Sequence, residues 1–411
     1  LYVNVKCVLT HTPVVDAYRG AGRPEACYML ERAIDEAAVK FGLSPVEIRK
    51  KNFIPKDAMP FKTATGTVYD SGDFARNLGD ALKNARWDSF PVRRKESEAA
   101  GRLRGIGLAY YIECTVGDDT EEVTLEFTAD GKVLYYVGTQ TTGQGHLTTF
   151  SQIIAERLGI DLERVELVEG DSTRKSSGGG TSGSRSLQMI GNAAHQATGA
   201  AIAKGKKLAA KVLEAEEVDF ADGLFRARGT NRSIAILDLA EKARAAGQSL
   251  DVTTTFTKEA STFPNGCHIA EVEVDPETGV VEIVDYTVVD DFGVVINPLV
   301  VAGQVHGGVA QGLGQALTER VVFDDSGQIL TGSFMDYGIP KAHHVPFIRF
   351  STNEVRCATN PLGIKGCGEA GTIGACPAFM NAVMDALRPK GVRHLDMPAT
   401  PERVWRALRA V

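Results

Sequence analysis

The chain has 411 residues and a net charge of −7, with 43% hydrophobic and 24% charged residues. This length predicts two or three domains, and the composition is that of an ordinary globular protein. The acidic balance gives no reason to expect nucleic acid or an anionic membrane as a partner. No run approaches the roughly 18 consecutive apolar residues of a membrane span, so we expect none.

The cysteines are scattered and form no CxxC pair. There are seven of them: Cys7, Cys27, Cys114, Cys267, Cys357, Cys367 and Cys376. Iron–sulfur clusters and zinc sites need closely spaced thiolates, so neither is predicted. The spacing instead indicates free thiols in a reducing cytoplasm. The chain opens with neither a basic leader nor an apolar signal core, so we expect a cytoplasmic location.

The first hundred residues are predicted to form a strand, two helices and then irregular chain. Residues 1–9 are strand-like, and residues 24–41 place apolar side chains on one helical face. A capping box at residues 44–47, with Pro at the first helical position, opens a second, short helix. Residues 56–101 are polar and broken, so we place a domain boundary near Arg102.

Beyond Arg102 the pattern alternates between hairpins and helices. Residues 121–127 and 132–137 form one predicted hairpin, and residues 269–275 and 280–289 form another. Helices are predicted over residues 146–158, 186–206, 302–317, 377–387 and 401–410. Hairpins with interspersed helices indicate an α+β protein with mixed sheets rather than a doubly wound parallel sheet.

Glycine is clustered in four loops, three of which open directly onto a predicted helix, while the fourth lies shortly before one: residues 17–23, 138–146, 178–186 and 363–371. Glycine lets backbone N–H groups approach a ligand, and a helix N-terminus favours anions. Several such loops would suit a long cofactor that carries phosphate. Arg19, Arg185 and Lys365 are candidates to neutralise it, and Gln140 and Gln144 to bind heterocycle edges. Tight turns remain the open alternative, because no loop has the Walker pattern or a clean GxGxxG in a βαβ unit.

Taken together, the loops are more specific. The motifs are AYRGAGRPEA (17–26), GTQTTGQGH (138–146), GTSGSRS (180–186), DDFGVVINPLVVAGQVHGGVAQGLGQAL (290–317), GSFMDYGIP (332–340) and NPLGIKGCGEAGTIGA (360–375). In this order they resemble the molybdenum-binding subunits of the xanthine dehydrogenase and aldehyde oxidase family. The likeness is greatest to the bacterial branch that includes the carbon monoxide dehydrogenase large subunits.

The resemblance implies a hydroxylase or dehydrogenase that oxidises an aldehyde or an N-heterocyclic aromatic with water as the oxygen source. Glu369 would be its catalytic base. The pterin, molybdopterin and commonly its cytosine dinucleotide, would be held by Arg19, Gly20, Ala21, Gln140, Gly143, Gln144, Gly145, His146, Thr181, Ser182, Gly183, Ser184, Arg185, Ser186, Lys365, Gly366, Cys367 and Gly368. The resemblance implies no molybdenum ligand from this chain.

Further partners are implied by the same resemblance. Two [2Fe-2S] clusters and FAD are expected on an iron–sulfur subunit and an FAD subunit, or on other domains, in a dimer of heteromers with a small-molecule substrate. Family subunits carry several hundred residues before this point, so we expect a fragment or one of two split molybdenum subunits. Residues 1–101 would be the remnant of a first molybdopterin-binding domain, and residues 102–411 a second that carries Glu369.

Two other functions stay open at this stage. Copper-type carbon monoxide oxidation is disfavoured, because in that branch a cysteine in the AYRxxxR loop binds copper, whereas this chain has Gly20-Ala21-Gly22 there. A non-catalytic cofactor-binding or assembly module would retain the fold, but Glu369 argues against it. The pair His343-His344 is more simply a solvated loop than a metal site.

Overall fold

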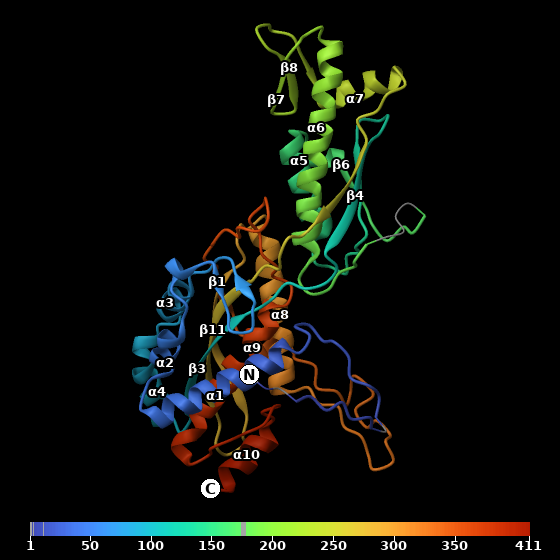
Figure 1. The fold of residues 1–411 in the computed structure, drawn as a ribbon. Helices are drawn as coiled ribbons and strands as arrows, with labels where there is room; N and C mark the ends of the chain where they lie inside the picture. Colours follow the sequence, from blue (N-terminus) through green and yellow to red (C-terminus); the bar gives the residue numbers. More distant parts are fainter. Residues whose placement is uncertain (1, 3, 11, 174–177) are drawn as a thin grey trace.

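The computed structural model describes residues 2, 4–10, 12–173 and 178–411. Figure 1 shows two lobes, a large one at the bottom and a small one at the top. The chain leaves the large lobe after β3 (Leu103–Ile112) and returns at β11 (Asn265–Val274). These strands are antiparallel neighbours with Ile112 opposite Asn265, so the small lobe is an insertion between two adjacent strand ends.

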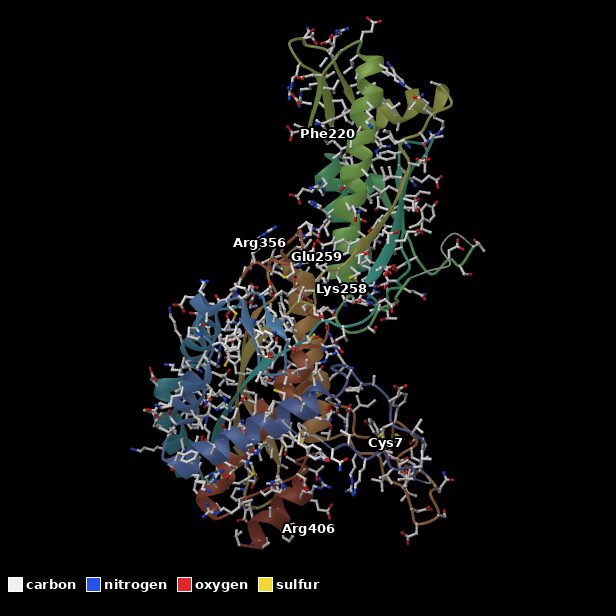
Figure 2. The ribbon with its side chains drawn as sticks, viewed as in Figure 1. Cys7, Phe220, Lys258, Glu259, Arg356 and Arg406 are labelled. Atoms are coloured by element: carbon white, nitrogen blue, oxygen red, sulfur yellow. The ribbon has the colours of Figure 1, made fainter. Side chains whose placement is uncertain are left out.

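The connections between the lobes are tied together where they cross. Lys258 donates from Nζ to the carbonyl oxygen of Gly117 at 3.1 Å and pairs with Asp119 at 2.9 Å. Figure 2 labels Lys258 and Glu259 at this junction, with Arg356 of the large lobe nearby. The outgoing and returning segments therefore cross the junction as a bonded pair.

The large lobe is a four-stranded mixed sheet covered by helices. Its strand order is β13-β12-β11-β3, antiparallel except for β12 and β13. Its other elements are α1 (Arg23–Phe41), α2 (Pro45–Asn52), β1 (Phe61–Lys62), β2 (Val68–Tyr69), α3 (Phe74–Asn84), α4 (Phe90–Ala99), β12 (Val281–Asp291), α8 (Pro298–Leu317), β13 (Ile348–Thr352), α9 (Ala370–Leu387) and α10 (Pro401–Arg409).

Both faces of this sheet are buried. On β11, Cys267 and Ile269 pack with Leu78 of α3, whereas Ala270 and Val272 belong to the core formed with α8 and α9. Side chains of a strand alternate between faces, so helices on both sides leave nearly every residue of β11 buried. Two apolar cores thus hold the central strands in place.

Helices α8 and α9 lie unusually close together, and this contact positions the start of α9. A Cβ added to Gly308 would lie 3.0 Å from the Cα of Gly371, and one added to Gly371 would lie 2.5 Å from the carbonyl oxygen of Val305. Gly308 and Gly312 therefore serve the packing of α8 on α9, which offsets their cost in helix propensity. The residue immediately before α9 is Glu369.

The small lobe has its own sheet and core. The strand order is β10-β4-β5-β6, with a separate three-stranded sheet β7-β8-β9. The elements are β4 (Thr120–Phe127), β5 (Val133–Tyr136), α5 (His146–Leu158), β6 (Val165–Val168), the π-helical segment Leu187–Gly191, α6 (Asn192–Val212), β7 (Val218–Ala221), β8 (Leu224–Ala227), β9 (Ser233–Ala235), α7 (Ile236–Ala245) and β10 (Val252–Thr257). Helices α5 and α6 pack on one face of the larger sheet, where apolar side chains form a separate core.

The structure confirms the α+β class and most of the predicted elements. A helix occurs as predicted at 146–158, the helix predicted over 401–410 occurs at 401–409, and both predicted hairpins form. The capping box is present, with Ser44 Oγ accepting from Glu47 N and Glu47 accepting from Ser44 N. Local signals such as caps and turn residues were therefore sufficient for these elements.

Several predictions were wrong. In the described part of residues 1–9 there is no strand, and Val5, Val8 and Leu9 are exposed, because no neighbouring strand supplies hydrogen bonds. Residues 56–101 are not irregular but contain α3 and α4. The helix predicted to begin at Pro377 begins at Ala370, with Pro377 inside it.

Two of the predicted helix boundaries also differ. The predicted helix 186–206 is a π-helical segment followed by α6, which continues to Val212. The helix predicted over 302–317 begins earlier, at Pro298, where the Asn297 side chain accepts a hydrogen bond from Val300 N. The start of this helix was predicted too late because its N-cap, Asn297, lies before the apolar residues from which the helix was predicted.

Two segments of the large lobe extend away from the sheets. Figure 1 shows the N-terminal segment and the long connection between α8 and β13 reaching to one side, and Figure 2 labels Cys7 there. Phe334 and Met335 in the connection are 88% and 93% exposed. In the described part of the chain no helix combines the length and the apolar character that crossing a bilayer requires.

Candidate functional site

A cavity of about 470 Å³ lies where the two lobes meet. It is lined by the start of α5, the loop before the π-helical segment, the first turns of α8, and the loop that leads into α9. The lining residues are Arg19, Thr142, Gly143, Gln144, His146, Thr149, Phe150, residues 181–187, Asn297, Val300, Val301, Gln304, Gln311 and residues 365–369. The four glycine-rich loops predicted from the sequence therefore converge on one cavity.

Most of the predicted site residues line this cavity, and four do not. The four that are absent from the lining are Gly20, Ala21, Gln140 and Gly145. The Gln140 carbonyl oxygen accepts from Thr181 Oγ1 at 3.1 Å, and a Cβ on Gly145 would lie 3.1 Å from Val300. These residues shape the loops that the lining residues occupy.

Glu369 lies at one end of the cavity, at the start of α9, and is 8% exposed. Its Oε1 accepts from the backbone N–H of Gly20 at 3.0 Å, and its Oε2 lies 2.9 Å from Ser184 Oγ. The Arg23 guanidinium approaches both carboxylate oxygens at 3.3 and 3.4 Å. The carboxylate is thus fixed by two segments that are far from it in the sequence, residues 20–23 and Ser184.

Glu113 is a second carboxyl at this end of the cavity, and the sequence analysis missed it. It follows the last residue of β3, is 1% exposed, and lies 2.6 Å from Ser184 Oγ and 3.2 Å from Arg23 Nη1. Burial, and then the nearby Glu369 carboxylate, raise the pKa of Glu113 to about 8. The sequence signal that could have identified Glu113 is a single acidic residue directly after an apolar strand.

Arg19 joins the loop of Glu369 to helix α8. Its guanidinium donates to the carbonyl oxygen of Gly368, to Oε1 of Gln311 at 2.9 Å, and to Gln304 at 3.0 Å. Gln304 and Gln311 also line the cavity, and the sequence analysis did not select either. They lie seven residues apart on α8, a spacing that puts both on one helical face.

Arg185 and Lys365 do not offer free charges to a phosphate. Arg185 is 1% exposed and pairs with Glu121 at 2.9 Å, while Lys365 is 2% exposed and pairs with Asp291 at 2.6 Å. Each pair neutralises the charge that the sequence analysis assigned to a phosphate. Both side chains instead anchor the loops from which the cavity is built.

The α5 end of the cavity contains polar atoms without a protein partner. His146 Nδ1 lies 3.3 Å from Glu169 Oε2, and the ring stacks on Phe150 with centroids 4.7 Å apart. Its Nε2 and the Thr149 hydroxyl are buried, and neither has a hydrogen-bond partner. Burial lowers the pKa of His146, which makes the ring a neutral donor or acceptor. A polar ligand would satisfy these atoms.

The remaining candidate residues are Cys367 and the pair His343 and His344. Cys367 lines the cavity beside Glu369, and burial raises its pKa to about 12, so it is a neutral thiol. His343 and His344 lie in a short 3₁₀ turn, Ala342–His344, in the connection between α8 and β13. Among the described residues, no group of three His, Cys, Asp or Glu side chains is arranged to hold a metal ion.

Comparison with known proteins agrees with this arrangement. The chain is 35% identical to the carbon monoxide dehydrogenase large chain of Hydrogenophaga pseudoflava, over 99% of this chain and 54% of that protein. It is 33% identical to the nicotine 6-hydroxylase large subunit of Paenarthrobacter nicotinovorans, over 100% of this chain and 53% of that protein. The chain thus spans about half the length of the curated relatives it matches.

The same fold occurs in solved structures. Quinoline 2-oxidoreductase from Pseudomonas putida 86 superimposes with a TM-score of 0.88 at 33% identity, over 96% of this chain and 53% of that chain. Two family profiles, each described as a molybdopterin cofactor-binding domain, match residues 1–53 and 80–346. The resemblance inferred from the motifs is therefore confirmed: the chain belongs to the family of molybdopterin cofactor-binding domains.

Proposed function

We propose that this chain is the C-terminal part of the molybdenum-cofactor subunit of a hydroxylase or dehydrogenase, which oxidises an aldehyde or an N-heterocyclic aromatic with water as the oxygen source. The observation that carries the proposal is the buried carboxylate of Glu369 at the end of the cavity between the lobes. Nicotine 6-hydroxylase and quinoline 2-oxidoreductase, among the similar proteins, are named for N-heterocycles.

The cavity suits a long polar cofactor. His146 and Thr149, whose Nε2 and Oγ1 have no partner, line it together with the loops 181–186 and 365–368. We propose that these segments hold molybdopterin, as its cytosine dinucleotide. When bound, the cofactor supplies the redox centre that accepts two electrons from the substrate.

Glu369 acts as general base in this proposal. A carboxylate that is fixed by Gly20 N–H, Ser184 and Arg23 keeps one orientation, so its free lone pairs meet the reacting water in a constant geometry. Glu369 then takes up the proton that this water loses. Arg19 holds the preceding loop against α8, so that the carboxylate does not move away.

The wider assembly is proposed on the same grounds. We assign residues 1–101 to the remnant of a first molybdopterin-binding domain and residues 102–411 to the second. The first half of the molybdenum subunit, an iron–sulfur subunit with [2Fe-2S] clusters and an FAD subunit complete the enzyme. We propose a dimer of such heteromers in the cytoplasm.

Copper-type carbon monoxide oxidation is the alternative that the name of one relative suggests. The loop expected to carry the copper thiol has Gly20-Ala21-Gly22 here, and the next cysteine, Cys27, lies on α1 with a pKa raised by burial. A non-catalytic module would have no need for a buried carboxylate held by Gly20, Arg23 and Ser184. Both alternatives are therefore less well supported than the hydroxylase.

Metal and pterin analysis of the complete purified subunit tests the proposal. We expect about one molybdenum and one pterin nucleotide per subunit, both retained in Glu369→Gln, and turnover of an aldehyde or N-heterocycle by the wild type only. Carbon monoxide turnover with bound copper would replace the proposal by the alternative. A folded subunit without molybdenum or pterin would contradict it. The isolated 411-residue chain should bind the cofactor weakly, since the other half of the cradle is contributed by the first half of the subunit.

A further inference from the structure

Two buried carboxyl groups meet at a single hydroxyl beside the cavity. Ser184 Oγ lies 2.6 Å from Glu113 Oε1 and 2.9 Å from Glu369 Oε2, and it accepts a hydrogen bond from the backbone N–H of Glu369 at 3.1 Å. The three residues come from the end of β3, the loop before the π-helical segment and the start of α9. Nothing in the proposed function uses Glu113.

The number of protons at Ser184 decides the charge of this cluster. A serine hydroxyl has one proton to donate and two lone pairs that accept. One lone pair accepts the Glu369 N–H, and the single hydroxyl proton can be donated to only one of the two carboxylates. The other contact then joins two oxygens with no proton between them, unless that carboxyl is itself protonated and donates to Ser184. All three contacts are satisfied when the two carboxyl groups hold one proton between them.

The surrounding charges agree with this count. Arg23 is the guanidinium that hydrogen-bonds to both carboxyls in the described structure, with Nη1 on Glu113 and Nη2 on Glu369. The other titratable groups near Glu113 are Arg19, which is bonded to carbonyl and amide oxygens, and the neutral Cys367 and Tyr111. Arg23 with one anionic and one neutral carboxyl leaves these three hydrogen-bonded groups without net charge, which burial favours, whereas the nearby Arg19 hydrogen-bonds to neither carboxyl.

Glu113 is the better holder of the proton. Its Oε2 is buried without a partner, whereas Glu369 accepts an additional N–H from Gly20 and is the more exposed of the two. Donors stabilise the anionic form, and burial without donors stabilises the neutral form. Burial, and then the nearby Glu369 carboxylate, raise the pKa of Glu113 to about 8, which also favours the protonated form of Glu113.

We infer that Glu113 and Glu369 share one proton through the Ser184 hydroxyl, and that Glu113 holds it at rest so that Glu369 is the free base. This inference rests on the proposed role of Glu369 and makes Glu113 a positioning residue. In the resting form Glu113 donates to Ser184 and Ser184 donates to Glu369. Moving both protons one step makes Glu113 anionic and Glu369 neutral, with no change in the number of protons.

The test compares the pH profile of the complete enzyme with that of Glu113→Gln. The amide donates to Ser184 as the protonated carboxyl does but does not titrate. The pH profile of the wild-type kcat/KM should show a transition near pH 8, where the shared proton leaves. At neutral pH the kcat/KM of Glu113→Gln should stay within about tenfold of the wild-type value. The transition near pH 8 should be missing from the profile of this variant. The control Glu282→Gln, at an exposed position of β12, should keep the wild-type profile.

A second readout needs no turnover. The folded-state pKa of Glu113 is raised from 4.5 to about 8, so the folded protein binds the proton more tightly than the unfolded one. The stability that this group contributes is full below about pH 4.5 and is lost as the pH rises through 8. The difference in denaturation midpoint between Glu113→Gln and the wild type should therefore shift in favour of the variant between about pH 5 and pH 9.

Infrared spectroscopy on the wild type covers the case in which Glu113→Gln does not fold. The band of a protonated buried carboxyl should fade as the pH rises through 8, and Ser184→Ala should shift its frequency by removing the acceptor. Absence of such a band at pH 6, or an unchanged pH profile and midpoint in Glu113→Gln, would overturn the inference. Full turnover by Glu369→Gln would instead overturn the proposed function, while the midpoint and the band would still report on the shared proton.

Discussion

The two ends of the cavity are built in opposite ways. At the α9 end, Glu369 is held by Gly20, Arg23 and Ser184, and each of these bonds joins residues far apart in the sequence. At the α5 end, His146 Nε2 and Thr149 Oγ1 have no protein partner. The first end is ordered by the protein itself, whereas the second leaves two buried polar atoms without a hydrogen-bond partner.

This difference separates the interactions that would position a catalytic group from those that would bind a ligand. Preorganised groups need no rearrangement when charge develops, which is the condition for efficient catalysis. Unsatisfied buried polar atoms cost stability in the free protein, and a ligand that bonds to them recovers this loss. The predictions below test each end separately.

Glu369→Gln should have the largest effect. The amide keeps the shape of the side chain but cannot accept a proton, so turnover by the complete enzyme should fall by about 10²- to 10⁴-fold, the usual contribution of a general base. Molybdenum and pterin content should stay at the wild-type level. A variant that retains a tenth of the wild-type rate would show that the ordered end is not where the base lies.

Lys365→Met tests whether buried ion pairs keep the ordered end in place. The substitution leaves Asp291 buried without its cation, which should cost about 3–5 kcal/mol in a denaturation experiment. The double variant Lys365→Met/Asp291→Asn should recover part of this loss. As a matched control, Arg228→Met breaks an exposed pair with Glu217 and Asp219 and should leave the denaturation midpoint almost unchanged, because water screens exposed charges. Equal losses of stability in Lys365→Met and Arg228→Met would show that the buried ion pair contributes no more than the exposed one.

His146→Leu tests the open end. The leucine keeps apolar packing on Phe150 but removes Nε2, so one hydrogen bond to the cofactor is lost. A bond worth about 0.5–1.5 kcal/mol corresponds to roughly two- to tenfold weaker cofactor retention, measured as pterin released during dialysis. The exposed His394→Leu serves as the control and should retain the cofactor fully. Retention by His146→Leu equal to this control would remove His146 from the binding site.

Gly143→Ala should destabilise the protein less than the same substitution at the ordered end. Gly143 has a φ of +115°, and no atom lies within 4 Å of the added Cβ, so only backbone strain of roughly 1–2 kcal/mol opposes the change. At the ordered end, the same change at Gly366 would bring a Cβ to 2.5 Å from the carbonyl oxygen of Ser184. Denaturation midpoints should therefore fall further for Gly366→Ala, and the reverse order would contradict the contrast between the ends.

Local sequence signals determined a large part of the fold. The capping box at Ser44 and Glu47, and the turn around Asp130-Gly131, depend on bonds between residues only a few positions apart. Helix α3 was missed although its signals were present, since Asp73 is an N-cap and Phe74, Leu78 and Ala81 follow at helical spacing. The segment was predicted to be irregular because it is polar overall, although its few apolar residues recur at helical spacing.

The candidate site divides in the same way. The sequence determined that four glycine-rich loops and Glu369 belong together, because their motifs and order are specific to one family. It did not determine which charges are free. Arg185 and Lys365 have the same appearance in the sequence as any phosphate-binding residue, and only the fold brings Glu121 and Asp291 against them.

The role of Glu113 was also decided by tertiary structure alone. An acidic residue at the end of a strand is usually solvated, and it is the packing of α9 and the Ser184 loop over the end of β3 that buries this one beside Glu369. Caps and turns are settled by neighbours along the chain, so a sequence contains them. Protonation states and ion pairs are settled by neighbours in space, and these come from segments more than 60 residues away.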